Sequence, residues 1–151
     1  MDGLTIRALV AGETDAAAAI HRRGMATIAC FDLDRHTPEE DRAYYRDDVF
    51  PDCEILGAFV NRVLLGHVAW RPGWIEHFYV DPSRQSAGIG TRLLAGVQAQ
   101  QDDIQLWTFQ ANSGARRFYE RHGFVAEQFT DGADNEEHEP DVRYRWRRAA
   151  S

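Results

Sequence analysis

The chain has 151 residues, enough for one domain with a buried core. Hydrophobic residues make up 44% and charged residues 27%, as in an ordinary globular protein. The formal net charge is −7, which argues against a broad nucleic-acid-binding face, because such a face needs cations to neutralise phosphates. We therefore expect a single domain, residues 1–151, that binds no nucleic acid.

The sequence also lacks several targeting and reactive groups. No apolar run approaches the length of a membrane span, and the first residues do not resemble a signal peptide, so we expect a cytoplasmic protein that uses no membrane. All 17 basic residues are Arg, which excludes a lysine nucleophile and is typical of a bacterial protein from a GC-rich genome. Cys30 and Cys53 are isolated, and we expect them to be small buried side chains.

The first part of the chain predicts a strand and two helices. β-forming residues alternate weakly over 4–10, which indicates a strand. The Ala-rich stretch 13–28 has a helical period. The run Thr37–Glu40 is a capping box with proline at the first helical position, which predicts a second helix. This helix should reach about Val49 and end before Pro51.

The rest of the chain predicts strands interrupted by two helices. The predicted strands lie at 54–60, 62–70, 74–80, 104–109, 124–129 and 142–146. The predicted helices lie at 91–101 and 112–122, the second with Asn112 as N-cap and Gly123 just beyond its end. Residues 130–141 form a polar, acidic loop. This order predicts a mixed α/β (α+β) domain whose central part is antiparallel.

The segment Val80–Thr91 follows a predicted strand and leads into a helix. Gly88 and Gly90 have no Cβ, so a ligand can approach the backbone closely. Free amides at the helix start, together with the helix dipole, favour an anion, and Arg84 adds a charged donor. A Gly-x-Gly pair alone is equally typical of a capping turn. A P-loop would need a lysine, and a dinucleotide-binding fingerprint would need glycine at Leu93.

A second motif one strand later gives this loop a context. Gln85, Gly88 and Gly90 match the pyrophosphate motif Gln/Arg-x-x-Gly-x-Gly/Ala. The downstream matches to Asn-x-x-Ala-x-x-x-Tyr-x-x-x-Gly-Phe are Asn112, Ala115, Tyr119, Gly123 and Phe124. With both motifs at the expected separation and the same order of elements along nearly the whole chain, the sequence resembles the GCN5-related N-acetyltransferase (GNAT) superfamily.

This resemblance implies a central mixed, largely antiparallel sheet of about six or seven strands, flanked by about four helices, with splayed strands around the CoA arm. It implies acetyl-CoA as the acyl donor and no metal. The residues expected to contact CoA are Phe78, Tyr79 and Val80 along the pantetheine arm; Gln85, Ser86, Ala87, Gly88, Ile89, Gly90 and Thr91 at the pyrophosphate; Asn112, Ala115 and Tyr119 beside the arm; and Arg84, Arg116 or Arg117 at the adenosine phosphates.

The resemblance also implies direct attack of a primary amine, from a small molecule or peptide, on the thioester. Tyr119 matches the position of the acid that protonates the thiolate, with plain core packing as the alternative. Two residues are candidate bases, with an ordered water as the alternative. Strand alternation places Glu76 beside Phe78, where burial would raise its pKa, and places His77 on the opposite face with Ile75.

The acceptor side is the least determined. The resemblance places it between the first two helices and the last strand pair, where His36–Glu39 and the loop 131–141 lie. The carboxylates of this loop would attract a cationic amine, or the loop is simply solvated. A CoA-binding regulatory domain without catalysis remains an alternative function. The acceptor, the acyl chain, and the choice between monomer and homodimer stay open.

Overall fold

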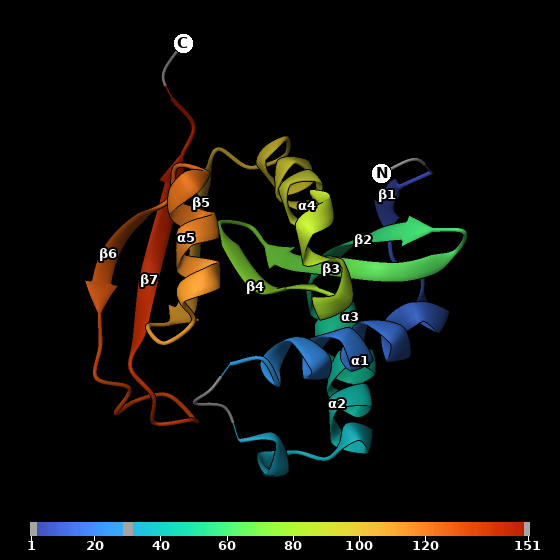
Figure 1. Ribbon diagram of the computed structural model, residues 1–151, viewed down its shortest axis with the longest axis horizontal. Helices are drawn as coiled ribbons and strands as arrows, with labels where there is room; N and C mark the ends of the chain where they lie inside the picture. Colours follow the sequence, from blue (N-terminus) through green and yellow to red (C-terminus); the bar gives the residue numbers. More distant parts are fainter. Residues whose placement is uncertain (1–2, 29–31, 150–151) are drawn as a thin grey trace.

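The computed structural model describes residues 3–28 and 32–149. At its centre is one seven-stranded sheet with the strand order β1-β2-β3-β4-β5-β7-β6 (Figure 1). β4 and β5 run parallel, and the other neighbouring strands are antiparallel, which confirms the expected mixed sheet. The strands are β1 (Thr5–Ala8), β2 (Glu54–Val60), β3 (Val63–Arg71), β4 (Trp74–Val80), β5 (Asp103–Phe109), β6 (Val125–Phe129) and β7 (Asp141–Arg147).

Helices cover both faces of this sheet (Figure 1). The longer ones are α1 (Thr14–Met25), α2 (Pro38–Tyr44), α4 (Ile89–Gln98) and α5 (Ser113–Arg121). Short helical segments are η1 (Ala11–Glu13), η2 (Leu33–Arg35), η3 (Tyr45–Val49), α3 (Phe50–Asp52) and η4 (Pro82–Ala87). α4 and α5 pack in one apolar cluster with the sheet, and α1 packs with η3 in a second cluster. No helix in the described ranges has both the length and the apolar character that a membrane crossing requires.

Local signals explain where several helices begin. The Thr37 hydroxyl accepts the Glu40 amide, and the Glu40 carboxylate accepts the Thr37 amide, so the predicted capping box is present at the start of α2. Asn112 caps α5 by accepting the amide of Ala115. Gly123 follows α5 with φ +89°, a conformation that favours glycine. Local hydrogen bonds thus define the start of α2 and the start of α5, and Gly123 terminates α5.

The helical run from Pro38 does not stop before Pro51, contrary to the sequence prediction. It continues through the π-helical segment η3 and the single turn α3 to Asp52. Pro51 has no amide hydrogen, so it cannot donate to the carbonyl of Asp47. The wider π turn accommodates that missing bond, and Pro51 then occupies the first turn of α3, where its amide is not needed. Cys53, half-buried and free, follows this turn, while Cys30 lies outside the described residues.

A β-bulge interrupts β4. Trp70 of β3 pairs with Ile75, and its neighbour Ala69 pairs with His77. Glu76 therefore has no partner on β3 and is the extra residue of the bulge. Ile75 therefore packs in the cluster beneath α4 and α5, as Phe78 does, while His77 faces α1. The prediction that Ile75 and His77 share a face was wrong, because the extra residue of a bulge interrupts the alternation of side chains between the two faces.

β4 and β5 separate almost as soon as they meet. Their ladder has one pair, Trp74 with Gln105, and the Gln105 amide donates to the carbonyl of Gly73 at 2.8 Å. Beyond this point, the β4 edge that faces β5 has no strand partner within the described residues. The expected splay is thus present, and the bulge at Glu76 lies just beyond the last pair of the two strands.

Candidate active site

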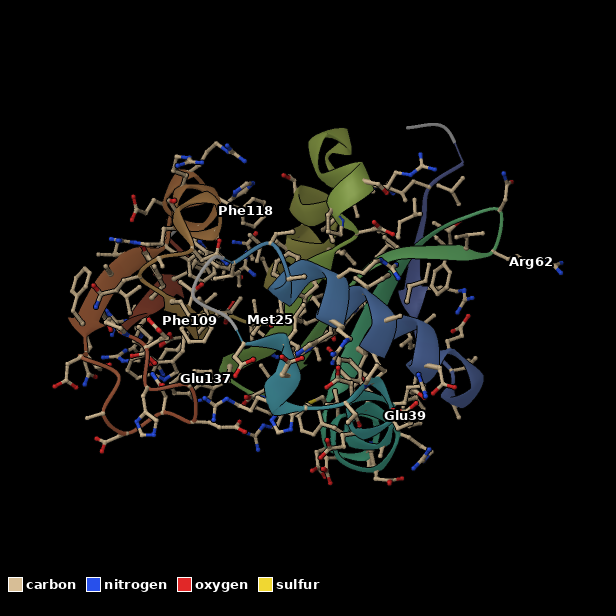
Figure 2. All side chains as sticks on the ribbon, turned by 60° about the horizontal axis from the view of Figure 1, so that its bottom comes forward. Met25, Glu39, Arg62, Phe109, Phe118 and Glu137 are labelled. Carbon is tan, nitrogen blue, oxygen red and sulfur yellow. The ribbon has the colours of Figure 1, made fainter. Side chains whose placement is uncertain are left out.

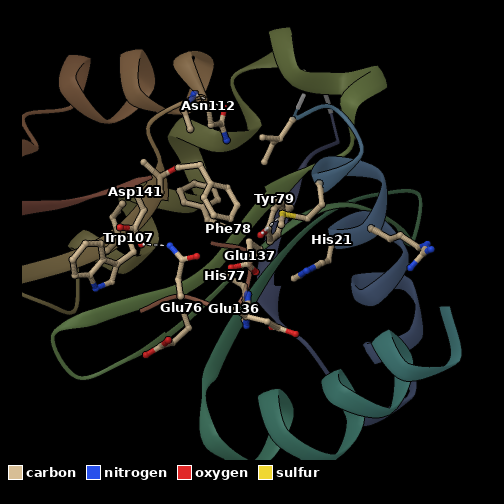
Figure 3. A pocket seen from close by; sticks show the side chains of 18 of the residues that line it. His21, Glu76, His77, Phe78, Tyr79, Trp107, Asn112, Glu136, Glu137 and Asp141 are labelled. Atoms are coloured by element: carbon tan, nitrogen blue, oxygen red, sulfur yellow. Dashed lines mark hydrogen bonds between the residues drawn. The ribbon is translucent and has the colours of Figure 1, made fainter. Parts of the chain in front are cut away.

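A cavity of about 610 Å³ occupies the gap where β4 and β5 separate. Side chains reach it from α1, β4, β5, the start of α5 and the loop 130–140 (Figure 3). Figure 2 shows Met25, Phe109 and Glu137, which come from three of these walls, converging on the same region. Elements far apart in the sequence therefore form one site.

The predicted phosphate loop directly follows β4, whose residues Phe78 and Tyr79 line this cavity. The Asp81 carboxylate accepts the Ser83 amide and hydroxyl and forms an ion pair with Arg23 at 3.0 Å, which holds the start of η4 against α1. Gly88 has φ +75° and directly precedes α4, so the first amides of that helix lack partners within it. At Gly90, a Cβ would lie 3.3 Å from the Phe118 ring. Glycine there also lets α4 approach α5 closely.

Three predicted CoA contacts on α4 and α5 have other partners in this structure. Asn112 lines the cavity, but its Oδ1 is used in capping α5. The Thr91 hydroxyl lies 3.2 Å from His122 Nε2. Arg116 donates from Nε to the Tyr144 hydroxyl at 3.0 Å, and its guanidinium also lies over the Phe129 ring. The guanidinium therefore points toward β6 and β7 in this structure, and a contact of Arg116 with CoA stays a prediction.

Tyr119 faces the cavity from α5. Its ring packs between Phe78 and Phe124, with centroid distances of 6.2 and 5.4 Å, and the residue is 8% exposed. Burial raises the pKa of the hydroxyl well above its usual value, so Tyr119 is protonated at neutral pH. The hydroxyl forms no hydrogen bond with any described residue and is free to donate to a ligand.

Glu76 does not sit among apolar neighbours as expected. Its side chain is 31% exposed, and one carboxylate oxygen accepts two bonds from Arg71, at 2.6 and 3.0 Å. The bulge turns this residue toward the strand edge, where the Arg71 guanidinium can reach it. The predicted apolar burial of Glu76 is therefore wrong.

His77 lies in the cavity wall, as Figure 3 shows. Its Nε2 is 2.8 Å from the Tyr44 hydroxyl. Burial lowers the pKa of His77 to about 4, so the ring is neutral at pH 7. The expectation that it titrates near neutrality was wrong, because the sequence does not show how deeply α1 and α2 cover this part of β4.

Sequence reasoning missed a buried chain of three side chains beside the cavity. The Tyr45 hydroxyl lies 2.8 Å from His21 Nδ1 and 2.8 Å from His67 Nε2. Burial lowers the pKa of His21 to about 3 and that of His67 well below its usual value. The signal that could have revealed the chain is His67 itself, a histidine within an apolar strand, which requires a buried partner.

Carboxylates dominate the polar lining of the cavity. They are Glu40, Asp41, Glu76, Glu136, Glu137 and Asp141. Arg22 also lines it, but its guanidinium is bound by Asp41 at 2.9 Å and by two backbone carbonyls. His36 Nε2 lies 2.7 Å from a Glu136 carboxylate oxygen, which joins the residues just before α2 to the acidic loop. Glu137 has no hydrogen-bond or ion-pair partner among the described residues, so its charge is available to a ligand.

Within residues 3–28 and 32–149, no group of three or more His, Cys, Asp or Glu side chains is arranged to hold a metal ion. Three features together define a GNAT-type acetyltransferase. The mixed sheet separates between two parallel strands, a helix preceded by glycine follows the first of these strands, and a tyrosine faces the gap. The sequence model of the acetyltransferase (GNAT) domain matches residues 46–126. The chain belongs to this family.

Individual relatives agree with this assignment. The chain is 32% identical over 69 residues to blasticidin-S acetyltransferase from Streptomyces morookaense, a match that covers 40% of this chain and about half (48%) of that protein. Among solved structures, apo YjaB from Escherichia coli has a TM-score of 0.75 at 18% identity, with 97% of this chain and 99% of YjaB covered. The yncA protein from Salmonella typhimurium, solved with acetyl-CoA, has a TM-score of 0.72 at 16% identity, with coverage of 98% and 95%.

Proposed function

We propose that the protein transfers an acetyl group from acetyl-CoA directly to a primary amine of a small molecule or peptide. The observation that carries this proposal is the Tyr119 hydroxyl, which faces a cavity between splayed strands and bonds no residue in the described ranges. The acetyl-CoA bound to the Salmonella neighbour and the activity named for the Streptomyces relative support the same donor chemistry.

The donor would lie along the free edge of β4. Beyond Trp74, the backbone from Phe78 to Val80 has no strand partner among the described residues on the side of β5, so pantetheine could add to the sheet as a short strand would. The backbone of residues 85–91 would bind the pyrophosphate at the start of α4. The Asn112 amide would bond the arm, and Arg84 or Arg117 would approach the adenosine phosphates.

The acceptor would enter from the carboxylate side as an ammonium ion. Neutral His77 would take one proton from it, which leaves a lone pair on the amine nitrogen to attack the thioester carbon. The tetrahedral intermediate then expels the CoA thiolate, and Tyr119 donates its proton to that sulfur. The nitrogen loses its second proton to give the neutral amide, and that proton restores the Tyr119 hydroxyl. Glu76 is a poorer base, because Arg71 already holds its carboxylate.

Two measurements test this function. Acetyl-CoA should raise the melting temperature of the protein, because a ligand that binds only the folded state stabilises it, whereas ATP should not. Thiol release from acetyl-CoA should then depend on an added cationic amine. Stabilisation without thiol release on any amine of a broad panel would favour the alternative, a CoA-binding regulatory domain. A shift with ATP alone would contradict both functions.

A further inference from the structure

The buried chain His67–Tyr45–His21 connects the interior of the sheet to the cavity. His67 is fully buried on β3, Tyr45 is fully buried on η3, and His21 lies on α1 at the cavity wall. Both hydrogen bonds of the Tyr45 hydroxyl are 2.8 Å long. A hydroxyl has one hydrogen, so it donates to one imidazole and accepts from the other.

The direction of hydrogen-bond donation along these three side chains is set at the buried end, by His67. His67 Nδ1 is the buried side-chain atom that has no partner among the described residues. A neutral imidazole carries one hydrogen, and a buried N–H without an acceptor is a costly arrangement. The hydrogen of His67 therefore belongs on Nε2, where the Tyr45 oxygen accepts it. The Nδ1 lone pair is what remains without a partner.

The rest of the chain follows from this assignment. Because the Tyr45 oxygen accepts from His67, its own hydrogen is donated to His21 Nδ1. The hydrogen of His21 must then sit on Nε2, the ring nitrogen that has no bond to any described residue. His21 is consequently a donor at the cavity wall and has no lone pair to offer there.

We infer that His21 is a fixed hydrogen-bond donor of the acceptor site, positioned by Tyr45 and His67, and that the acceptor presents an oxygen to it. This inference rests on the proposed function. Two other donors on this side are already bonded, Arg22 to Asp41 and Asn135 to the Glu139 carbonyl. The carboxylates of the cavity can only accept hydrogen bonds, so they suit the ammonium group of the acceptor.

The matching acceptor combines a cationic amine with a nearby carbonyl or hydroxyl oxygen, as in an amino amide or an amino alcohol. A simple alkyl diamine can satisfy the carboxylates but offers nothing to His21. The cavity should therefore select the oxygen-bearing amine through its Michaelis constant, since binding of both substrate and transition state includes the same hydrogen bond.

The first test reads the tautomer directly. Ring ¹⁵N spectra of the full chain at pH 7, with His21 assigned from the His21→Gln variant, should show Nδ1 unprotonated and Nε2 protonated. In Tyr45→Phe this preference should disappear, because the hydroxyl that fixes it is gone. A His21 ring protonated on Nδ1 in the unmodified protein would overturn the inference, whatever the enzymatic activity.

The second test separates selectivity from catalysis. His21→Phe should raise the KM of an amino amide about tenfold, the effect of one hydrogen bond, and leave the KM values of an alkyl diamine and acetyl-CoA unchanged. His21→Gln, which keeps a donor, should restore most of the loss, and His138→Gln on the exposed loop is the matched control. Equal losses on both amines would refute the role of His21 but leave the transferase function intact. No transfer to any amine would refute that function, while the ¹⁵N result would still decide the tautomer.

Discussion

The Tyr79 ring on β4 lies directly against the α-carbon of Gly24 on α1. A Cβ at Gly24 would come within 2.8 Å of Tyr79 Cδ1, closer than real contacts allow. The same ring packs on His21 with a centroid distance of 4.5 Å, and its hydroxyl donates to the Met25 sulfur. Gly24 therefore sets how closely α1 approaches the strand that would hold the donor.

Replacement of Gly24 by alanine should destabilise the protein by about 1–3 kcal/mol, because the ring must move within a packed core. Urea unfolding would measure this change. Gly12→Ala is the matched control, since nothing lies within 4 Å of a Cβ at Gly12 and its stability should hardly change. A Gly24→Ala protein as stable as the parent would show that Tyr79 can shift freely.

Tyr119→Phe should lower kcat by roughly 10²–10⁴-fold, the usual range for loss of a general acid. Binding of acetyl-CoA and the free energy of unfolding should change little, because the hydroxyl forms no hydrogen bond with the described residues. Steady-state thiol release and calorimetric titration with acetyl-CoA would check both parts. Unchanged turnover in this variant would show that a group other than Tyr119 protonates the CoA sulfur.

Glu76 and His77 should respond differently to removal of their basic groups. Glu76→Gln should keep kcat within about threefold, because its carboxylate is already bound to Arg71, whereas His77→Leu should lower kcat by about 10²-fold or more. Arg71→Gln serves as a control for loss of the ion pair itself. The reverse order of the two effects would identify Glu76 as the base.

Glu137→Gln should raise the KM of a cationic amine several-fold, because an unpartnered carboxylate at the cavity contributes directly to attraction of the ammonium group. The effect should shrink in high salt, which screens exposed charges. Asp131→Asn, on the same loop but outside the cavity lining, is the control. Identical KM values for these two variants would indicate that Glu137 acts only through the net charge.

The buried histidines should make stability depend on pH. His21 and His77 have folded-state pKa values of about 3 and about 4, so between pH 7 and pH 5 the unfolded chain binds protons that the folded chain does not. Stability should therefore fall as the pH falls through this window, by about 2 kcal/mol for each of these histidines at pH 5.

Urea unfolding at several pH values would measure this slope. His77→Gln should reduce it, and His138→Gln, at an exposed position, should leave it unchanged. A slope that is the same in all three proteins would mean that the His77 ring is not held neutral by burial. Carboxylates contribute mainly below this window, because their usual pKa values lie near 4.

Local sequence signals predicted much of the fold and little of the polar site. The Thr37–Glu40 capping box, the Gly88 turn and the alternating strands depend on neighbouring residues, and the structure contains them. The bulge at Glu76 depends on the partner strand, whose register a single strand cannot reveal. The direction of Arg116 depends likewise on Tyr144, which comes from another element.

The bonds around Tyr45 illustrate the same limit. His21, Tyr45 and His67 lie on three elements, 24 and 22 residues apart along the chain, and only tertiary packing brings them together. No periodicity in the sequence distinguishes these three from ordinary core residues. The sequence does show a histidine within the apolar strand β3. Burial of an imidazole requires a hydrogen-bond partner, but the sequence does not identify that partner.

The bulge in β4 has a consequence for how this site could be remodelled. If Glu76 were deleted, Ile75 and His77 would become neighbours in a regular strand and would still face opposite sides, as they do now. What the deletion would remove is the added twist at the point where β4 leaves β5. Deletion of Glu76 would therefore remove one carboxylate from the cavity wall and one residue of backbone length from β4, while Ile75 and His77 would keep their sides of the sheet.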